Sequence, residues 1–100
     1  MSAPVSFFDV VHGRQQTLNT LLCVGLDPDL SKIPRRYHSA ARPVLAFCRD
    51  VIDATHDLVA AYKPQFAHFA AADALDDLKE VIAYGREVGV PIILDAKRGD

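Results

Sequence analysis

Apolar, strand-like segments alternate along this chain with amphipathic, helix-like segments. The strand-like segments are residues 20–27, 59–69 and 90–97, and the helix-like ones are residues 7–18, 43–58 and 72–89. Strands that are apolar on both faces are typical of a parallel sheet covered by helices. The alternation therefore predicts an α/β fold, either a doubly wound sheet or a (β/α)₈ barrel.

Individual residues indicate where these elements begin and end. Pro43 suits the first turn of a helix, and Gly89 followed by Pro91 suits the end of another. Asp73 is a candidate N-cap for the helix over 72–89. Pro64 lies inside the second strand-like segment and predicts that this strand ends nearby, because proline has no N–H to donate to a ladder.

Length, charge and cysteine content narrow the classes of function. The 100 residues correspond to one domain at most, and a net charge of −2 gives no reason to expect nucleic acid or an anionic membrane as a partner. No apolar run is long enough to span a membrane, and the first residues do not resemble a secretion signal.

Cys23 and Cys48 lie in apolar surroundings without a zinc-binding spacing, which predicts two buried free thiols in a reducing cytoplasm. The basic stretch 31–43 is interpreted as a solvated loop, because no aromatic platform accompanies it.

Charged residues lie after the first predicted strand, within the second and at the end of the third. They are Asp27, Lys63, Asp95, Lys97 and Asp100. The carboxyl ends of parallel strands meet at one rim, and active sites of parallel α/β proteins form there. The sequence therefore predicts a charged site at this rim.

The last six residues have the pattern D-x-K-x-x-D. Side chains alternate along a strand, so Asp95 and Lys97 are expected to point to the same face. Carboxylates stabilise a lysine as its ammonium ion, which disfavours both a Schiff-base lysine and a divalent metal site. The four histidines show no metal-ligand spacing. The pattern favours a cationic general acid, and a structural ion-pair network at a strand end is the alternative.

Three segments together resemble orotidine 5′-phosphate decarboxylase. They are "VGLDPD" at 24–29, "YKPQFAHF" at 62–69 and "DAKRGD" at 95–100, and the likeness is to the type 2 branch of that family. The resemblance implies a (β/α)₈ TIM barrel, of which residues 1–100 cover an N-terminal helix and the first three strands with two helices. Because such a barrel needs about 250 residues, the chain is expected to be truncated and inactive alone, with the phosphate- and pyrimidine-binding loops after Asp100.

The resemblance also implies a role for each charged residue. Asp27 and Lys63 would bind the ribose, and Lys63 would join the charge network. Asp95 would lie against the orotate carboxylate, and Lys97 would donate a proton to C6 as carbon dioxide departs. Asp100 would reach into the active site of the partner subunit of a cytoplasmic homodimer. Neither a metal nor an organic cofactor is implied.

The sequence departs from the family pattern after "KPQ". Family members often carry an acid a few positions later, whereas this chain has His68, Ala70 and Ala71, with Asp73 as a possible substitute. Alternative functions are a sugar-phosphate decarboxylase or aldol-type synthase of the same superfamily, a Schiff-base aldolase, and a non-catalytic βα module.

Overall fold

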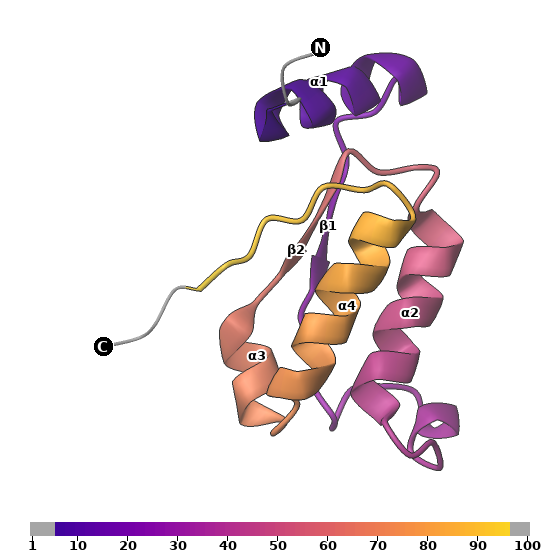
Figure 1. Cartoon of the computed structure of the whole chain (residues 1–100). Coiled ribbons are helices and arrows are strands. Elements are labelled where there is room, and N and C mark those ends of the chain that lie inside the picture. Colours follow the sequence, from indigo (N-terminus) through magenta and orange to yellow (C-terminus); the bar gives the residue numbers. More distant parts are fainter. Residues whose placement is uncertain (1–5, 97–100) are drawn as a thin grey trace.

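The structure, a computed structural model, describes residues 6–96 and has an α/β architecture (Figure 1). Its elements in chain order are α1 (Phe7–Leu18), β1 (Cys23–Leu26), the short 3₁₀ turn η1 (Arg35–Tyr37), α2 (Pro43–Thr55), β2 (Ala61–Pro64), α3 (Phe66–Ala71) and α4 (Leu75–Glu87). Figure 1 shows α2 and α4 side by side against the strands, with α1 at one end of the sheet and α3 at the other. Among residues 6–96, no helix has the length and apolar character needed to cross a membrane.

The sheet is built around β2. It pairs in parallel with β1, so that Val24 lies opposite Tyr62 and Gly25 lies opposite Lys63. On its other edge, β2 forms parallel bridges to the segment after α4, at Tyr62–Ile92 and Gln65–Asp95. The third predicted strand therefore lies where the sequence indicated, but within residues 90–96 it forms two bridges instead of a continuous strand.

One face of the sheet packs against α2 and α4 and forms the core. Leu26, Tyr62, Ile52 and Val81 are almost fully buried. The Tyr62 hydroxyl pairs with the Thr55 hydroxyl at 2.7 Å and donates to the carbonyl of Ile52 at 3.2 Å. Burial raises the pKa of Tyr62, so this residue acts as a neutral packing group whose polar tip has partners.

The opposite face of the sheet is open. Cys23, Gly25 and Lys63 are exposed there, because they alternate with the core-facing residues of the same strands. The prediction of two buried thiols is therefore wrong for Cys23 and correct for Cys48. Burial raises the pKa of the Cys48 thiol to about 12, which keeps it protonated and unreactive near neutral pH.

Hydrogen bonds and ion pairs between side chains connect α2 to α4 and to η1. Arg42 donates to the carboxylate of Asp77 at 2.7 Å and also pairs with Glu80, and so connects the start of α2 to α4. Arg36 donates to the Tyr37 hydroxyl, which donates in turn to Asp50. Two arginines of the basic stretch 31–43 thus have partners within the fold.

Two sequence predictions are wrong around α3. The segment 59–69 was predicted as one strand, but β2 ends at Pro64 and the chain turns directly into α3. Asp73 does not cap α4, because it adopts a left-handed conformation with φ 53° in the turn between the helices, and Ala74 takes the N-cap position. By contrast, Gly89 follows α4 with φ 86°, a conformation that favours glycine at a helix end.

Arg14 holds α1 across the end of the sheet where the strands begin. Its guanidinium donates to the carbonyls of His56, Val59 and Gly89, with 3.0 Å between Nη2 and the Val59 oxygen. No residue of α1 is fully buried. The attachment of α1 therefore depends more on these hydrogen bonds, and on the Thr20 bond to the Leu58 carbonyl, than on apolar packing.

We expect Arg14→Ala to lower the free energy of unfolding by about 2–3 kcal/mol, because it leaves partly buried carbonyls without their charged donor. Urea denaturation measures the loss, and faster amide exchange confined to α1 would locate it. Arg35→Ala serves as the control, because Arg35 is exposed on η1. An equal effect of the two substitutions would contradict this account.

Candidate functional site

The carboxyl ends of the paired segments are tied together by backbone hydrogen bonds. The amide of Gln65 donates to the carbonyl of Leu26 at 3.2 Å, and the amide of Phe66 donates to the carbonyl of Asp95 at 2.8 Å. The backbone amide of Asp95 donates in turn to the carbonyl of Pro64 at 3.0 Å. The start of α3 thereby fixes the ends of both neighbouring segments, and the rim they form is the candidate site.

Three of the predicted site residues share the open face of the sheet at this rim. Lys63 lies opposite Gly25, and Asp27 is two residues beyond Gly25 on the same side. Asp95 is bridged to Gln65, which is two residues beyond Lys63. Asp27 and Lys63 are exposed, and Asp95 is partly buried. The other two predicted site residues, Lys97 and Asp100, lie outside the described residues.

The Asp27 carboxylate lies close to Gly25. A Cβ atom at Gly25 would lie 3.5 Å from Oδ2 of Asp27. The side chain of Asp27 therefore folds back over the strand toward the centre of the open face. The distance of 3.5 Å is an ordinary van der Waals contact, so a methyl group added at position 25 would touch the carboxylate without displacing it.

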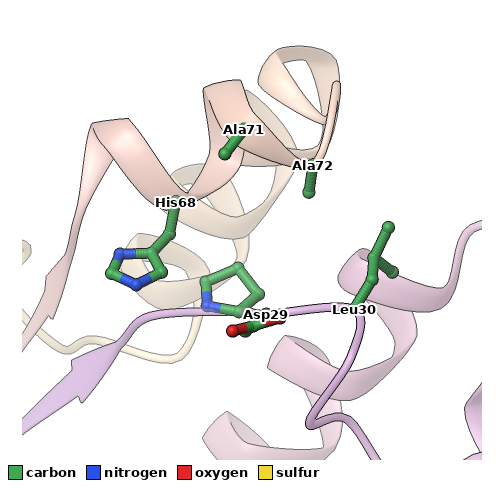
Figure 2. A pocket seen from close by; sticks show the side chains of 6 residues that line it. Asp29, Leu30, His68, Ala71 and Ala72 are labelled. Atoms are coloured by element: carbon green, nitrogen blue, oxygen red, sulfur yellow. The ribbon is translucent and has the colours of Figure 1, made fainter.

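A cavity of about 220 Å³ lies at the same rim, between the loop after β1 and α3 (Figure 2). Its lining residues are Pro28, Asp29, Leu30, His68, Ala71 and Ala72. Figure 2 shows the His68 imidazole extending from α3 toward the loop that carries Asp29. Two of the positions that depart from the family pattern, His68 and Ala71, thus line one cavity, whereas Asp73 does not take part in it.

Asp29 is held by the residue two positions later. The Ser31 hydroxyl donates to Oδ1 of Asp29 at 2.7 Å, and the Ser31 amide donates to the same oxygen at 2.9 Å. The bond from the Ser31 hydroxyl, and to a smaller extent the bond from its amide, lower the pKa of Asp29 below its ordinary value. The sequence analysis did not select Asp29, although an Asp side chain in a turn often accepts a hydrogen bond from the backbone two residues later, which could have indicated it.

Metal ligands do not gather at this rim in the part of the chain that the structure describes. No group of three His, Cys, Asp or Glu side chains in residues 6–96 has the spacing to hold a metal ion.

Comparison with known proteins identifies the family. A sequence model described as the "Orotidine 5′-phosphate decarboxylase / HUMPS family" matches residues 20–100. The chain belongs to this family. Its α/β fold is accordingly part of the TIM barrel of these decarboxylases, whose N-terminal portion it matches.

Individual relatives agree with this assignment. An orotidine 5′-phosphate decarboxylase of Ralstonia nicotianae is 52% identical over 96 residues, which are 94% of this chain and 35% of the relative. A candidate orotidine-monophosphate decarboxylase from Toxoplasma gondii superimposes with a TM-score of 0.80 at 37% identity, over 96% of this chain and 32% of that one. The Leishmania donovani OMP decarboxylase gives a TM-score of 0.73 at 40% identity, over 95% and 34% of the two chains. The chain thus spans about a third of the length of these relatives.

We expect Ser31→Ala to raise the pKa of Asp29 toward its ordinary value of 3.8, because the larger of the two bonds that favour the carboxylate is lost. A group whose pKa is lowered by folding stabilises the fold above its ordinary pKa, and this stabilisation is lost as the pH falls through the lowered value. The variant should therefore lose less stability than the parent on acidification below about pH 4. A carboxyl NMR titration measures the pKa, and Ser39→Ala is the control. An unchanged titration of Asp29 would contradict the assignment.

Proposed function

We propose that the protein to which this chain contributes decarboxylates orotidine 5′-phosphate to uridine 5′-phosphate, the last step of pyrimidine nucleotide synthesis. The observation that carries the proposal is the arrangement of Asp27, Lys63 and Asp95 on one open face, at the carboxyl ends of paired parallel segments. The names of the relatives support it, because relatives 47–52% identical to this chain are orotidine 5′-phosphate decarboxylases. Membership of the type 2 branch is part of the proposal.

The proposed mechanism relies on electrostatics. Asp27 and Lys63 hold the ribose hydroxyls, and Asp95 lies against the substrate carboxylate and repels it. The bond between C6 and the carboxylate carbon breaks, carbon dioxide leaves, and the electron pair stays on C6. The Lys97 ammonium donates its proton to C6. A developing carbanion without an adjacent electron sink needs fixed charges of this kind to lower its energy.

The complete active site is proposed to be shared between two subunits. In this scheme Asp100 reaches into the site of the partner subunit of a cytoplasmic homodimer and completes the charge network around Lys97. Neither a metal nor an organic cofactor is required, because the carboxylates and lysines supply the charge. Removal of divalent ions by EDTA should therefore leave the rate unchanged.

The family description leaves room for one alternative. It names a second group beside the decarboxylases, so a sugar-phosphate decarboxylase or aldol-type synthase of the same superfamily remains a candidate. Enzymes of that kind are expected to need Mg²⁺. Loss of activity with EDTA, together with turnover of a sugar phosphate, would favour this alternative.

A composite polypeptide tests the main proposal. It joins residues 1–100 to the part of the Ralstonia nicotianae relative that follows its matched segment. The decrease in orotidine 5′-phosphate absorbance measures turnover, and circular dichroism reports whether the protein is folded. We expect a folded protein that decarboxylates this substrate. A folded composite without turnover would sink the proposal.

Lys97→Ala in this composite should lower kcat by at least about 10²–10⁴-fold, which is the usual contribution of a general acid. Binding of uridine 5′-phosphate should remain measurable, because the ribose contacts assigned to Asp27 and Lys63 are retained. Lys79→Ala, at an exposed position on α4, provides the matched control. Full activity of the Lys97 variant would show that the proton comes from elsewhere.

The 100-residue chain by itself should show no turnover of orotidine 5′-phosphate. A closed barrel of this kind needs about 250 residues, and the chain covers 35% of its Ralstonia nicotianae relative. The same absorbance assay, with the composite as the positive control, tests this expectation. Measurable turnover by the short chain would overturn it.

A further inference from the structure

Tyr62 lies in the middle of the sheet, where all three paired segments meet. It is opposite Val24 of β1 and is bridged to Ile92 on the other edge of β2. Its amide donates to the Pro91 carbonyl at 3.0 Å, and its carbonyl accepts from the Ile93 amide at 2.8 Å. The backbone of Tyr62 therefore helps to join both neighbouring segments to β2.

The side chains of Tyr62 and Lys63 are coupled because these residues are consecutive in β2. Successive side chains of a strand point to opposite faces of the sheet. Tyr62 is 0% exposed in the core, whereas Lys63 is exposed on the open face. A rotation of β2 about its own axis would therefore move the tips of both side chains together, in opposite directions. A contact that holds the tip of Tyr62 also limits the range over which Lys63 can swing.

The tip of Tyr62 is held by the last turn of α2. Its hydroxyl pairs with the Thr55 hydroxyl at 2.7 Å and lies 3.2 Å from the carbonyl of Ile52. The Thr55 hydroxyl lies 2.7 Å from the carbonyl of Val51. If Tyr62 donates to Thr55, then Thr55 donates to Val51. If Thr55 donates to Tyr62, then Tyr62 donates to Ile52. In either direction both hydroxyl protons have acceptors, and the strand is bonded to the helix.

The Tyr62 hydroxyl adds a directional constraint that apolar packing does not provide. The core cluster that contains Tyr62 also includes Ile52, Val59, Val81 and Val90. A phenylalanine ring would fill the same space among these residues, apart from the hydroxyl. A buried hydroxyl that moves away from its partners loses hydrogen bonds that water cannot replace there, which is costly. Small displacements of β2 that apolar packing would tolerate are therefore disfavoured.

We propose that Tyr62 is a positioning residue for Lys63. Its bonds to α2 hold β2 in the orientation in which Lys63 acts at the rim. The role of Lys63 rests on the proposed decarboxylation, whereas the anchoring of β2 does not. Tyr62 lies on the core face, away from the open face where the substrate is proposed to bind. Its hydroxyl therefore affects the rate through Lys63 and not through a contact with the substrate.

Tyr62→Phe in the composite polypeptide removes the hydroxyl and keeps the ring. We expect kcat to fall about tenfold, which is less than the ~10²-fold that a 1 Å misplacement can cost. The affinity for uridine 5′-phosphate should change less than about threefold, because the precise placement of Lys63 matters most in the transition state. The absorbance assay measures kcat, and circular dichroism reports whether the variant is folded.

Thr55 provides an independent test of the same bonds. Thr55→Ser retains a hydroxyl and should keep the kcat of the parent. Thr55→Val should lower kcat, but less than Tyr62→Phe does, because Tyr62 can still donate to the Ile52 carbonyl. Adding Thr55→Val to Tyr62→Phe should lower kcat no further, because the second substitution removes no additional bond between β2 and α2.

Tyr84→Phe is the matched control. It also removes a tyrosine hydroxyl that bonds to α2, at Asp53, but Tyr84 belongs to α4 and not to a strand. This variant should keep the kcat of the parent. An equal fall of kcat in Tyr84→Phe and Tyr62→Phe would assign the effect to general stability and overturn the positioning role.

Amide hydrogen exchange provides a measurement that does not depend on turnover. The amides of Tyr62 and Gln65 donate to the segments on either side of β2. We expect both amides to exchange faster in Tyr62→Phe and Thr55→Val, and at the parent's rate in Tyr84→Phe. If the composite has no turnover while exchange changes in this way, the proposed decarboxylation fails and the anchoring stands.

Two results would contradict the role of Tyr62. One is an active composite in which Tyr62→Phe has the kcat of the parent. The other is exchange at the two amides that is the same in the parent and in all variants, whether or not the composite is active.

Discussion

Parallel backbone pairing on both edges of β2 is the constraint on which the rest of this structure depends. β1 pairs along one edge, and the segment containing Ile92 and Asp95 pairs along the other. Because all three run in the same direction, their carboxyl ends arrive at one rim. The bond from the Gln65 amide to the Leu26 carbonyl secures that rim across the sheet. Charged residues far apart in the sequence can therefore act on one small region of space.

Because side chains alternate along each strand, one face of the sheet is apolar and buried and the other carries the charged residues. Leu26 and Tyr62 anchor the strands to α2 and α4, where burial is almost complete. Asp27 and Lys63, on the other side, carry charges that would be costly to place in that core. Apolar packing on one face thus holds in place the strands that carry the charges on the other, as the proposed electrostatic mechanism requires.

The sequence predicted the alternation of helices and strands and the apolar faces, because these depend on local periodicity. It also predicted that Asp27, Lys63 and Asp95 gather at one rim of the sheet, although it placed Lys63 within its strand. It did not predict α3, because residues 66–71 are apolar and fit a strand as well as a helix. Asp73 was misassigned because the short helix α3 ends just before it, so that Asp73 lies in the turn between α3 and α4 with a left-handed conformation. The cavity that Asp29 and His68 both line depends on tertiary structure and has no periodic signature.

The attachment of α1 has a consequence for how this protein can vary. All the acceptors that Arg14 uses are main-chain oxygens, which every amino acid supplies. Exchanges at positions 56 and 59 keep those oxygens in place, so related proteins can diverge there without detaching the first helix. Arg14 itself cannot be exchanged in this way. A lysine has a single ammonium group in place of the planar guanidinium, and it cannot donate to several carbonyls in the same geometry. We therefore expect substitutions to be tolerated at positions 56 and 59 but not at Arg14.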